Sequence, residues 1–323
     1  MAVASLQSRG YLPIATAALC PASVLDCDLF IQRPGSPYAE LYRGSKYPLE
    51  QDDLDRLRVD GMDHLYIRSE DAEAFRKYLC DNVLHDPSVP APKRMKALRE
   101  VTRVTFQDAL TANDCNRMVD VATDFGRDLA CVVIERNIVF RELFTTLEHD
   151  FYTFTHVCNV SMYCAALASK MWMNSAEELA ELAAGALLHD VGKRHISPLI
   201  LNKPGKLTDD EWLQIREHPV SGFKELMGRG DLTWPQLMMV YQHHERLDGS
   251  GYPAGITGDE MHPWARLCAV ADVFDALTCQ RPYRRAMPLN DVCDYLLKHA
   301  GQWFDKEAVT CWTNHVRSVT QHE

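Results

Sequence analysis

Five of the thirteen histidines of this 323-residue chain, together with two aspartates, could bind metal ions. Neutral imidazole and carboxylate groups together suit first-row metals such as iron, manganese and zinc. Paired cysteines with the spacing of a structural zinc site do not accompany them. The candidate ligands are His156, the pair His189-Asp190, His218, the pair His243-His244, and Asp272.

Each candidate taken alone has a simpler explanation. A single histidine at the end of an apolar helix is more often a cap or a surface residue than a ligand, and this applies to His156 and His218. Two histidines in succession are harder to explain in this way. Asp272 lies in an apolar run, where an unpaired buried carboxylate would be costly. Together the residues predict a metal site, and a purely structural metal core stays open as an alternative.

The segments that would position these residues are predicted to be helices. From about Arg94 to the end of the chain, apolar residues recur at intervals of three and four. His189 and His243 each follow such an apolar segment. Thr208 and Glu211 have the spacing of a capping box, which predicts a helix start. Helix bundles commonly build metal sites from side chains on several helices, so a mainly α domain is expected.

The first part of the chain has a different character. Residues 24–31 and 65–67 have the pattern of extended segments. Ser69 would cap a helix that runs to about Leu84. These elements predict a small α+β domain, and its residues match no catalytic motif.

A proline-rich stretch separates the two parts. Residues 85–93 (HDPSVPAPK) hold three prolines and predict a stiff linker. We therefore expect a regulatory or accessory domain at residues 1–88 and a helical domain that holds the candidate ligands at residues 94–323. The fold class is mainly α, a helical bundle with a small N-terminal α+β domain.

The composition of the chain bears on its binding partners and on the cell compartment in which it works. The formal net charge of −11 opposes binding to DNA or long RNA. Eleven cysteines without CxxC spacing predict reduced thiols, and residues 12–20 do not make a convincing export signal. No apolar run reaches the ~20 residues that a membrane span needs. A cytoplasmic protein without membrane insertion is expected; a homodimer or a signalling-protein partner stays open.

Three motifs resemble those of a known family. The run 189–193 (HDVGK) resembles the HD signature of metal-dependent phosphohydrolases. The run 243–253 (HHERLDGSGYP) is similar to the HHExxDGxGYP signature of the HD-GYP branch. The runs 271–278 (ADVFDALT) and 281–284 (RPYR) also resemble that branch. The resemblance spans about residues 150–285 and does not cover the first 90 residues.

The resemblance implies a helical HD-type domain that binds two iron or manganese ions. One metal would be held by His156, His189, Asp190 and Asp272, and the other by His218, His243 and His244, with Asp190 bridging the two. Members that bind a third metal carry a glutamate where this chain has Tyr152, so two ions are expected rather than three.

The resemblance also implies hydrolysis of cyclic di-GMP to pGpG, to GMP, or to both, by a hydroxide that bridges the metals. Lys193 would act with Asp190 in catalysis and contact phosphate or the nucleophilic water. Tyr252 would contact a base or ribose, and Asp275 the N–H edge of a guanine. Arg281 and Arg284 would bind the second phosphate or stack on a guanine. Two alternatives stay open: a cyclic di-GMP receptor without hydrolysis, and an HD phosphohydrolase for another nucleotide.

Overall fold

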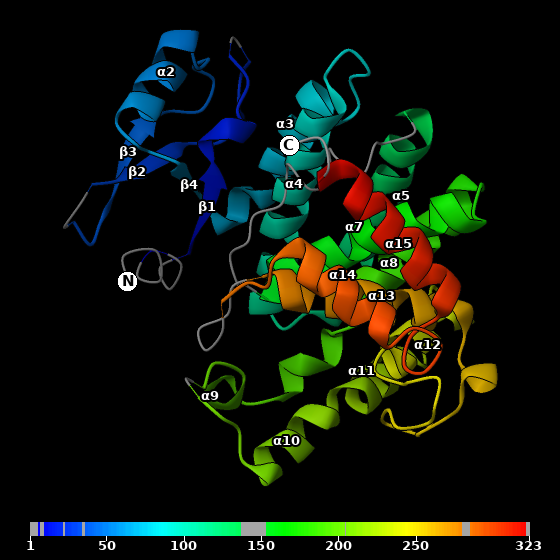
Figure 1. The fold of residues 1–323 in the computed structure, drawn as a ribbon. Coiled ribbons are helices and arrows are strands. Elements are labelled where there is room, and N and C mark those ends of the chain that lie inside the picture. The colour runs from blue at the N-terminus through cyan, green and yellow to red at the C-terminus, as the bar shows by residue number, and fades with distance from the viewer. Residues whose placement is uncertain are drawn as a thin grey trace. The chain divides into compact units, whose positions relative to one another are not determined.

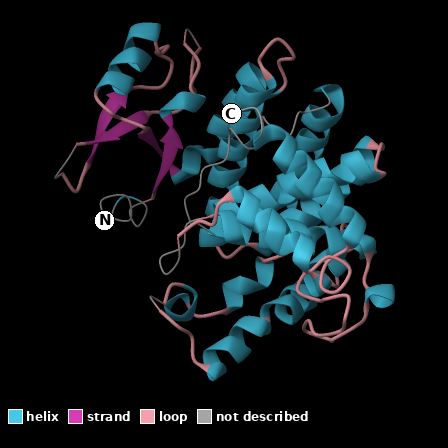
Figure 2. Cartoon of the chain, viewed as in Figure 1, coloured by secondary structure: helices cyan, strands magenta, loops and turns pink. Residues whose placement is uncertain are grey.

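The computed structural model describes residues 6, 10–21, 23–33, 36–136, 153–203, 205–279 and 285–320. The chain forms two compact units, Met1–Arg117 and Met118–Glu323. Strands lie in the first unit, and helices make up most of the described part of the second (Figures 1 and 2). The predicted mainly α fold with a small α+β part is confirmed.

The first unit is built on a four-stranded antiparallel sheet of order β1-β4-β2-β3. Its strands are β1 (Tyr11–Ala15), β2 (Leu29–Gln32), β3 (Ala39–Arg43) and β4 (His64–Arg68). Alternation along β4 sends Leu65 and Ile67 into the main core of this unit, while Tyr66 packs with Phe30 in a separate small cluster. The sheet is therefore covered by apolar contacts on both faces.

Helices complete the first unit: α2 (Gln51–Val59), α3 (Ala72–Leu79) and α4 (Ala91–Thr111). Two local predictions need correction. Residues 24–28 are not extended strand, because β2 begins at Leu29. Ser69 opens a 3-10 turn and makes no cap; α3 begins at Ala72 and is followed by a π-helical turn at Cys80–Leu84.

The α4 helix belongs to the first unit, where it packs against α3 and β1. The division between the compact units therefore lies one long helix beyond the proline-rich stretch at residues 85–93. That this stretch links a regulatory or accessory domain at residues 1–88 to a helical phosphohydrolase domain at residues 94–323 stays a prediction.

The second unit is a bundle of helices. Their bounds are α5 (Cys115–Arg136), α7 (Thr153–Met171), α8 (Ala176–Leu188), α9 (Pro198–Leu201), α10 (Asp209–Arg216), α11 (His218–Leu226), α12 (Trp234–Gln242), α13 (Pro263–Thr278), α14 (Leu289–Lys298) and α15 (Lys306–Thr320), with 3-10 turns η4 (Val191–His195) and η5 (Gly258–Glu260). The capping box predicted at Thr208 and Glu211 is confirmed at the start of α10.

The α7 helix lies at the centre of this bundle. It packs against α8, α13 and α15, and α12 packs against α8, α11 and α13. Tyr163 of α7, Phe274 of α13 and Trp312 of α15 meet edge to face, with ring centroids 5.0–5.3 Å apart. All three side chains are fully buried, and removing a buried aromatic of this kind costs about 3–5 kcal/mol. This cluster holds α7 and α13, which carry candidate ligands, in a fixed relation.

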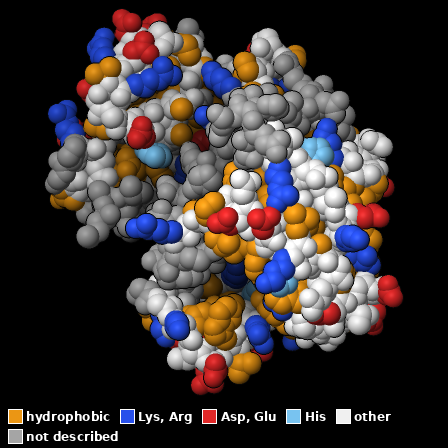
Figure 3. All heavy atoms as spheres, in the orientation of Figure 1, with side chains coloured by type: hydrophobic (Ala, Val, Ile, Leu, Met, Phe, Trp, Pro, Cys, Tyr) orange, Lys and Arg blue, Asp and Glu red, His pale blue; other side chains and the backbone are white. Residues whose placement is uncertain are grey.

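On the face shown in Figure 3, acidic and basic side chains of the described residues are interspersed. Among the described residues, no helix has the length and apolar character that crossing a membrane would need.

Candidate metal centre

Three of the candidate histidines stand where a helix ends or a new one begins. The Nδ1 of His189 lies 2.7 Å from the carbonyl oxygen of Ala186, and the Nδ1 of His218 lies 2.7 Å from that of Ile215. The Nδ1 of His243 lies 3.0 Å from the Val240 carbonyl oxygen. The last carbonyls of a helix lack helical partners, and a carbonyl can only accept. Each Nδ1 therefore donates a hydrogen bond to its carbonyl, and this turns each Nε2 toward the centre of the site.

His156 is oriented differently, because it lies in the first turn of α7. Its Nδ1 lies 2.7 Å from Oδ2 of Asp275 on α13. The other carboxylate oxygen of Asp275 accepts from Nδ2 of Asn159 at 2.8 Å. The Nε2 of His156 thus faces inward, 3.1 Å from Oδ1 of Asp272.

This arrangement corrects the expected role of Asp275. A contact from Asp275 to a guanine would need a free carboxylate edge, but the residue is 1% exposed and both oxygens are engaged inside the protein. Its position is that of a group that orients a candidate metal ligand, His156.

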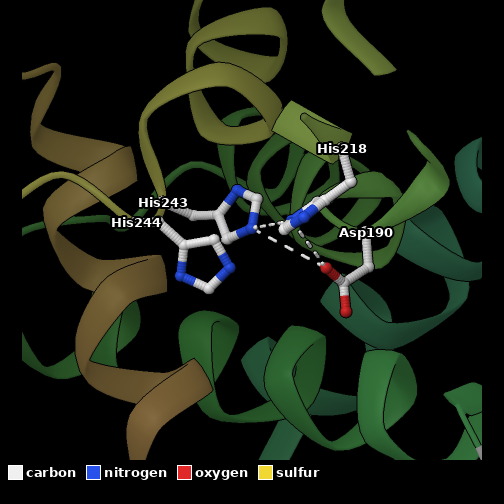
Figure 4. A group of neighbouring side chains, drawn as sticks. All are labelled: Asp190, His218, His243 and His244. Atoms are coloured by element: carbon white, nitrogen blue, oxygen red, sulfur yellow. Dashed lines mark hydrogen bonds and ion pairs between the residues drawn. The ribbon is translucent and has the colours of Figure 1, made fainter. Parts of the chain in front are cut away.

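Asp190 lies at the centre of the cluster, and its two oxygens face different sets of residues. Its Oδ2 lies 3.6 Å from Nε2 of His156 and 3.4 Å from Nε2 of His189. Its Oδ1 lies 3.2 Å from Nε2 of His218 and 3.7 Å from Nε2 of His243. Figure 4 shows the second set, in which the Nε2 atoms of His218 and His243 approach each other at 3.1 Å.

All seven predicted ligands come together in two adjacent groups. The ligand atoms within each group lie within 4.8 Å of one another. The groups are His156, His189 and Asp272, and Asp190, His218, His243 and His244.

Unsatisfied polar atoms show that a cation fits this centre. The Nε2 of His189 and Oδ1 of Asp190 are buried and have no hydrogen-bond partner, and buried polar atoms are rarely left unpaired without a bound water or ion. Burial lowers the pKa of His243 to about 4 and also depresses the pKa of His244. These two imidazoles are therefore neutral near pH 7, as metal binding requires.

The carboxylates of the centre are ionised. Burial alone would raise the pKa of Asp190, but Lys193 and His189 hold it well below its usual value. Likewise, hydrogen bonding to His156 outweighs burial and depresses the pKa of Asp272. Burial disfavours the charged form of His156, yet its bonds to Asp272 and Asp275 raise its pKa to about 9. A cation on Nε2 would take the place of that proton.

The loop after His244 is fixed by its own backbone. Glu245, 1% exposed, accepts hydrogen bonds from the amides of Ala254 (2.7 Å) and Gly255 (3.1 Å). A Cβ at Gly251 would collide with the backbone of Glu245, so only glycine permits this close approach. The ring of Tyr252 stacks on His244 at 4.7 Å and 27°. Tyr252 therefore supports a candidate ligand.

Of the remaining residues discussed for the site, the structure describes Lys193 but not the other three. Lys193 lies beside Asp190, with Nζ 2.5 Å from Oδ2. Tyr152, Arg281 and Arg284 lie outside the described residues.

A cavity of about 160 Å³ adjoins His243 and His244. Three residues that were not predicted for the site also line it: Arg216, Arg246 and Trp303. Arg246 stands inside the 243–253 motif and could have been found there. Trp303 joins the site only through tertiary contact, where its carbonyl oxygen accepts from the amide of Leu247 at 3.2 Å.

The segment that holds the candidate ligands also matches a known protein family. The model of the HD domain family matches residues 141–308, more than half of the chain. The chain belongs to the HD-GYP family. In this HD-GYP protein the HD pair is His189-Asp190, and the GYP tripeptide ends the run 243–253.

Curated relatives of this HD-GYP protein include phosphodiesterases. The cyclic di-GMP phosphodiesterase PA4108 of Pseudomonas aeruginosa is 29% identical over 255 residues, 73% of this chain and 60% of that protein. The cyclic di-GMP phosphodiesterase response regulator RpfG of Xanthomonas campestris is 40% identical, over 46% of this chain and 39% of that protein. The 3′3′-cGAMP-specific phosphodiesterase 3 of Vibrio cholerae is 39% identical, over 43% of this chain and 30% of that protein. The chain thus spans 30–60% of the length of these relatives.

The fold of the HD-GYP protein is also shared with a solved structure. Bd1817, an HDG"Y"P protein from Bdellovibrio bacteriovorus, matches with a TM-score of 0.68 and 20% identity, over 96% of this chain and 99% of that one. At this identity the likeness concerns the fold alone.

Proposed function

We propose that this protein is a metal-dependent phosphodiesterase that hydrolyses cyclic di-GMP to pGpG, to GMP, or to both. The observation that carries the proposal is the position of Asp190, whose two oxygens face two different sets of imidazoles. A carboxylate so placed suits two cations that share one ligand. The names of the relatives support a cyclic dinucleotide as substrate.

We assign one cation to His156, His189, Asp190 and Asp272, and the other to His218, His243, His244 and Asp190. Imidazole with carboxylate, in a cluster without cysteine, suits iron or manganese. When bound, two such ions supply Lewis acidity toward a phosphodiester and lower the pKa of water toward neutrality.

Side chains around the metal centre would stabilise its charges and contact the substrate. Asp190 stays anionic because Lys193 lies beside it. Lys193 is half-buried, so its ammonium can also stabilise negative charge on phosphoryl oxygens. Tyr252 keeps its predicted role at the base or ribose, in addition to its stacking on His244. Arg281 and Arg284 stay predicted substrate contacts.

The substrate could carry two guanine bases, as in cyclic di-GMP, or one guanine and one adenine, as in 3′3′-cGAMP. Three relatives in Vibrio cholerae that are 36–40% identical over part of this chain carry names specific for 3′3′-cGAMP. Hydrolysis of that hybrid dinucleotide is therefore the second candidate function. Both reactions would use the same metal centre.

The test is a turnover assay with a panel of nucleotides. Protein purified without oxygen and loaded with iron or manganese is incubated with cyclic di-GMP, 3′3′-cGAMP and guanosine mononucleotides. We expect turnover of a cyclic dinucleotide, lost in His189→Ala and Asp190→Ala. His195→Ala is the matched control, because His195 ends the 3-10 turn that follows Asp190 but is half-exposed and pairs with Glu225.

Three results would contradict the proposal. Turnover of mononucleotides alone would reassign the substrate. Tight binding of cyclic di-GMP without product, with both metals, would make the protein a receptor. Unfolding of both alanine variants, with no activity in the wild type, would indicate a structural metal core.

A further inference from the structure

The cavity beside the metal centre carries two guanidinium groups. It lies against His243 and His244, so a ligand that reaches the metals also borders this cavity. Arg216 enters from the end of α10, and Arg246 belongs to the loop that follows His244.

Arg216 is held by an aromatic ring rather than by a carboxylate. Its guanidinium carbon lies 5.3 Å from the centroid of Tyr252, a cation–π distance. No carboxylate forms an ion pair with Arg216 among the residues that the structure describes, and its side chain is exposed. Stacking on a ring leaves the N–H edge of a guanidinium free to donate.

Arg246, which lines the same cavity, has a similar environment. Its guanidinium carbon lies 3.9 Å from the centroid of Trp303. The ring of Trp303 also stacks on His299, at 3.8 Å and 2° between planes, which fixes the ring that Arg246 lies on. The hydrogen bond from Arg246 to Oγ of Ser250 is long, at 3.4 Å, so most of its N–H donors stay available.

The charge of this region favours an anion. The whole chain carries a formal net charge of −11, which opposes the approach of a dianion. Neither guanidinium forms an ion pair within the described residues, and Glu245, which also lines the cavity, accepts from the amides of Ala254 and Gly255. The planar donor edges of the two guanidinium groups match the oxygens of a phosphate better than a point charge would.

We propose that Arg216 and Arg246 form the binding site for the second, non-reacting phosphate of the cyclic dinucleotide, while the metal centre takes the phosphate that is cleaved. This inference rests on the proposed function, because it needs a substrate with two phosphodiesters in one ring.

The experiment compares a substrate with two phosphates and a substrate with one. Steady-state kinetics and equilibrium binding are measured with cyclic di-GMP, and kinetics with bis(p-nitrophenyl) phosphate, for metal-loaded wild type, Arg216→Gln, Arg246→Gln and Arg216→Lys. The matched control is Arg229→Gln, because Arg229 already pairs with Asp231 at 2.6 Å. Metal content and circular dichroism are recorded for each variant.

We expect KM and Kd for cyclic di-GMP to rise about 10- to 100-fold in each Gln variant, as for the loss of a charged hydrogen bond. The kcat for cyclic di-GMP should change much less, and Arg216→Lys should recover part of the affinity. The kcat/KM for bis(p-nitrophenyl) phosphate should fall by far less than that for cyclic di-GMP.

Equal losses with both substrates, or unchanged KM and Kd in both Gln variants, would overturn the phosphate site while leaving the proposed function in place. Absence of both turnover and binding of cyclic dinucleotides by the wild type would instead overturn the proposed function, and this inference with it.

Discussion

The Nδ1 of His156 on α7 lies 2.7 Å from Oδ2 of Asp275 on α13. At His189, His218 and His243, a helix carbonyl accepts from the same ring atom. Asp275 therefore accepts the hydrogen bond from His156 Nδ1, as a helix carbonyl does for the other three histidines. Unlike a carbonyl, its carboxylate also carries a negative charge. A carboxylate behind a metal-binding imidazole fixes its tautomer and makes Nε2 more basic.

Replacing Asp275 with Asn should weaken metal binding. The amide keeps the shape of the carboxylate but loses its charge, and changes of this kind cost about 10- to 100-fold in metal affinity. Competition with a chromophoric chelator measures the affinity. Asp294→Asn is the control, since Asp294 is exposed and pairs with Arg317. Equal affinity in wild type and Asp275→Asn would show that Asp275 does not support the site.

Two members of the ligand cluster, His189 and His243, could be placed from the sequence because they stand at helix ends, whereas Asp272 lies inside α13. A histidine that directly follows a helical segment has free carbonyls on one side, so the positions of His189 and His243 already suggest where their rings point. The role of Asp275 could not be predicted in this way. Its spacing from Asp272 shows that both lie on neighbouring faces of one helix, but the partner on α7 is brought there by packing.

The errors in the first unit have a similar origin. Residues 24–31 have suitable composition for a strand, but pairing begins only at Leu29, and β4 contacts this segment through Phe30 and Tyr66. A strand exists where a neighbour supplies hydrogen bonds, and composition alone does not give the neighbour. Trp303 was missed for the same reason, because only tertiary contact brings it beside Arg246.

Gly192 should tolerate no side chain. A Cβ there would collide with the carbonyl of His218 and lie 2.6 Å from the amide of Gly222, because η4 packs closely on α11. Gly192→Ala should cost about 1–3 kcal/mol of stability and lower the metal content by moving His218 away from Asp190. Urea unfolding and elemental analysis measure the two effects.

The matched control for Gly192 is Gly230→Ala, because a Cβ at Gly230 meets nothing within 4 Å. The same stability and metal content in both variants would contradict the close packing of η4 on α11.

Glu100 should make the first unit sensitive to acid. Burial alone would raise its pKa, but Arg103 and the amide of Ala15, 2.7 Å away, hold the pKa below its usual value of 4.5. A depressed pKa means that the stabilisation is complete above the usual value and is lost as the pH falls through the lower, folded value. Glu100→Gln should cost about 1.5–3 kcal/mol near pH 7, and progressively less below pH 4.5.

Hydrogen exchange of the β1 and α4 amides measures this stability within the first unit. Glu73→Gln is the control, because Glu73 makes an exposed pair with Arg76. A difference between Glu100→Gln and wild type that stays constant down to pH 3 would contradict the assignment.

The most direct test of the account is the metal content of protein purified without oxygen, measured by elemental analysis for wild type, Asp190→Ala and His195→Ala. We predict about two equivalents of iron or manganese per chain in the wild type and in His195→Ala. Asp190→Ala should lose most of both while its circular dichroism stays helical. Wild type with a single equivalent or none, or Asp190→Ala with two, would contradict a pair of cations shared through Asp190.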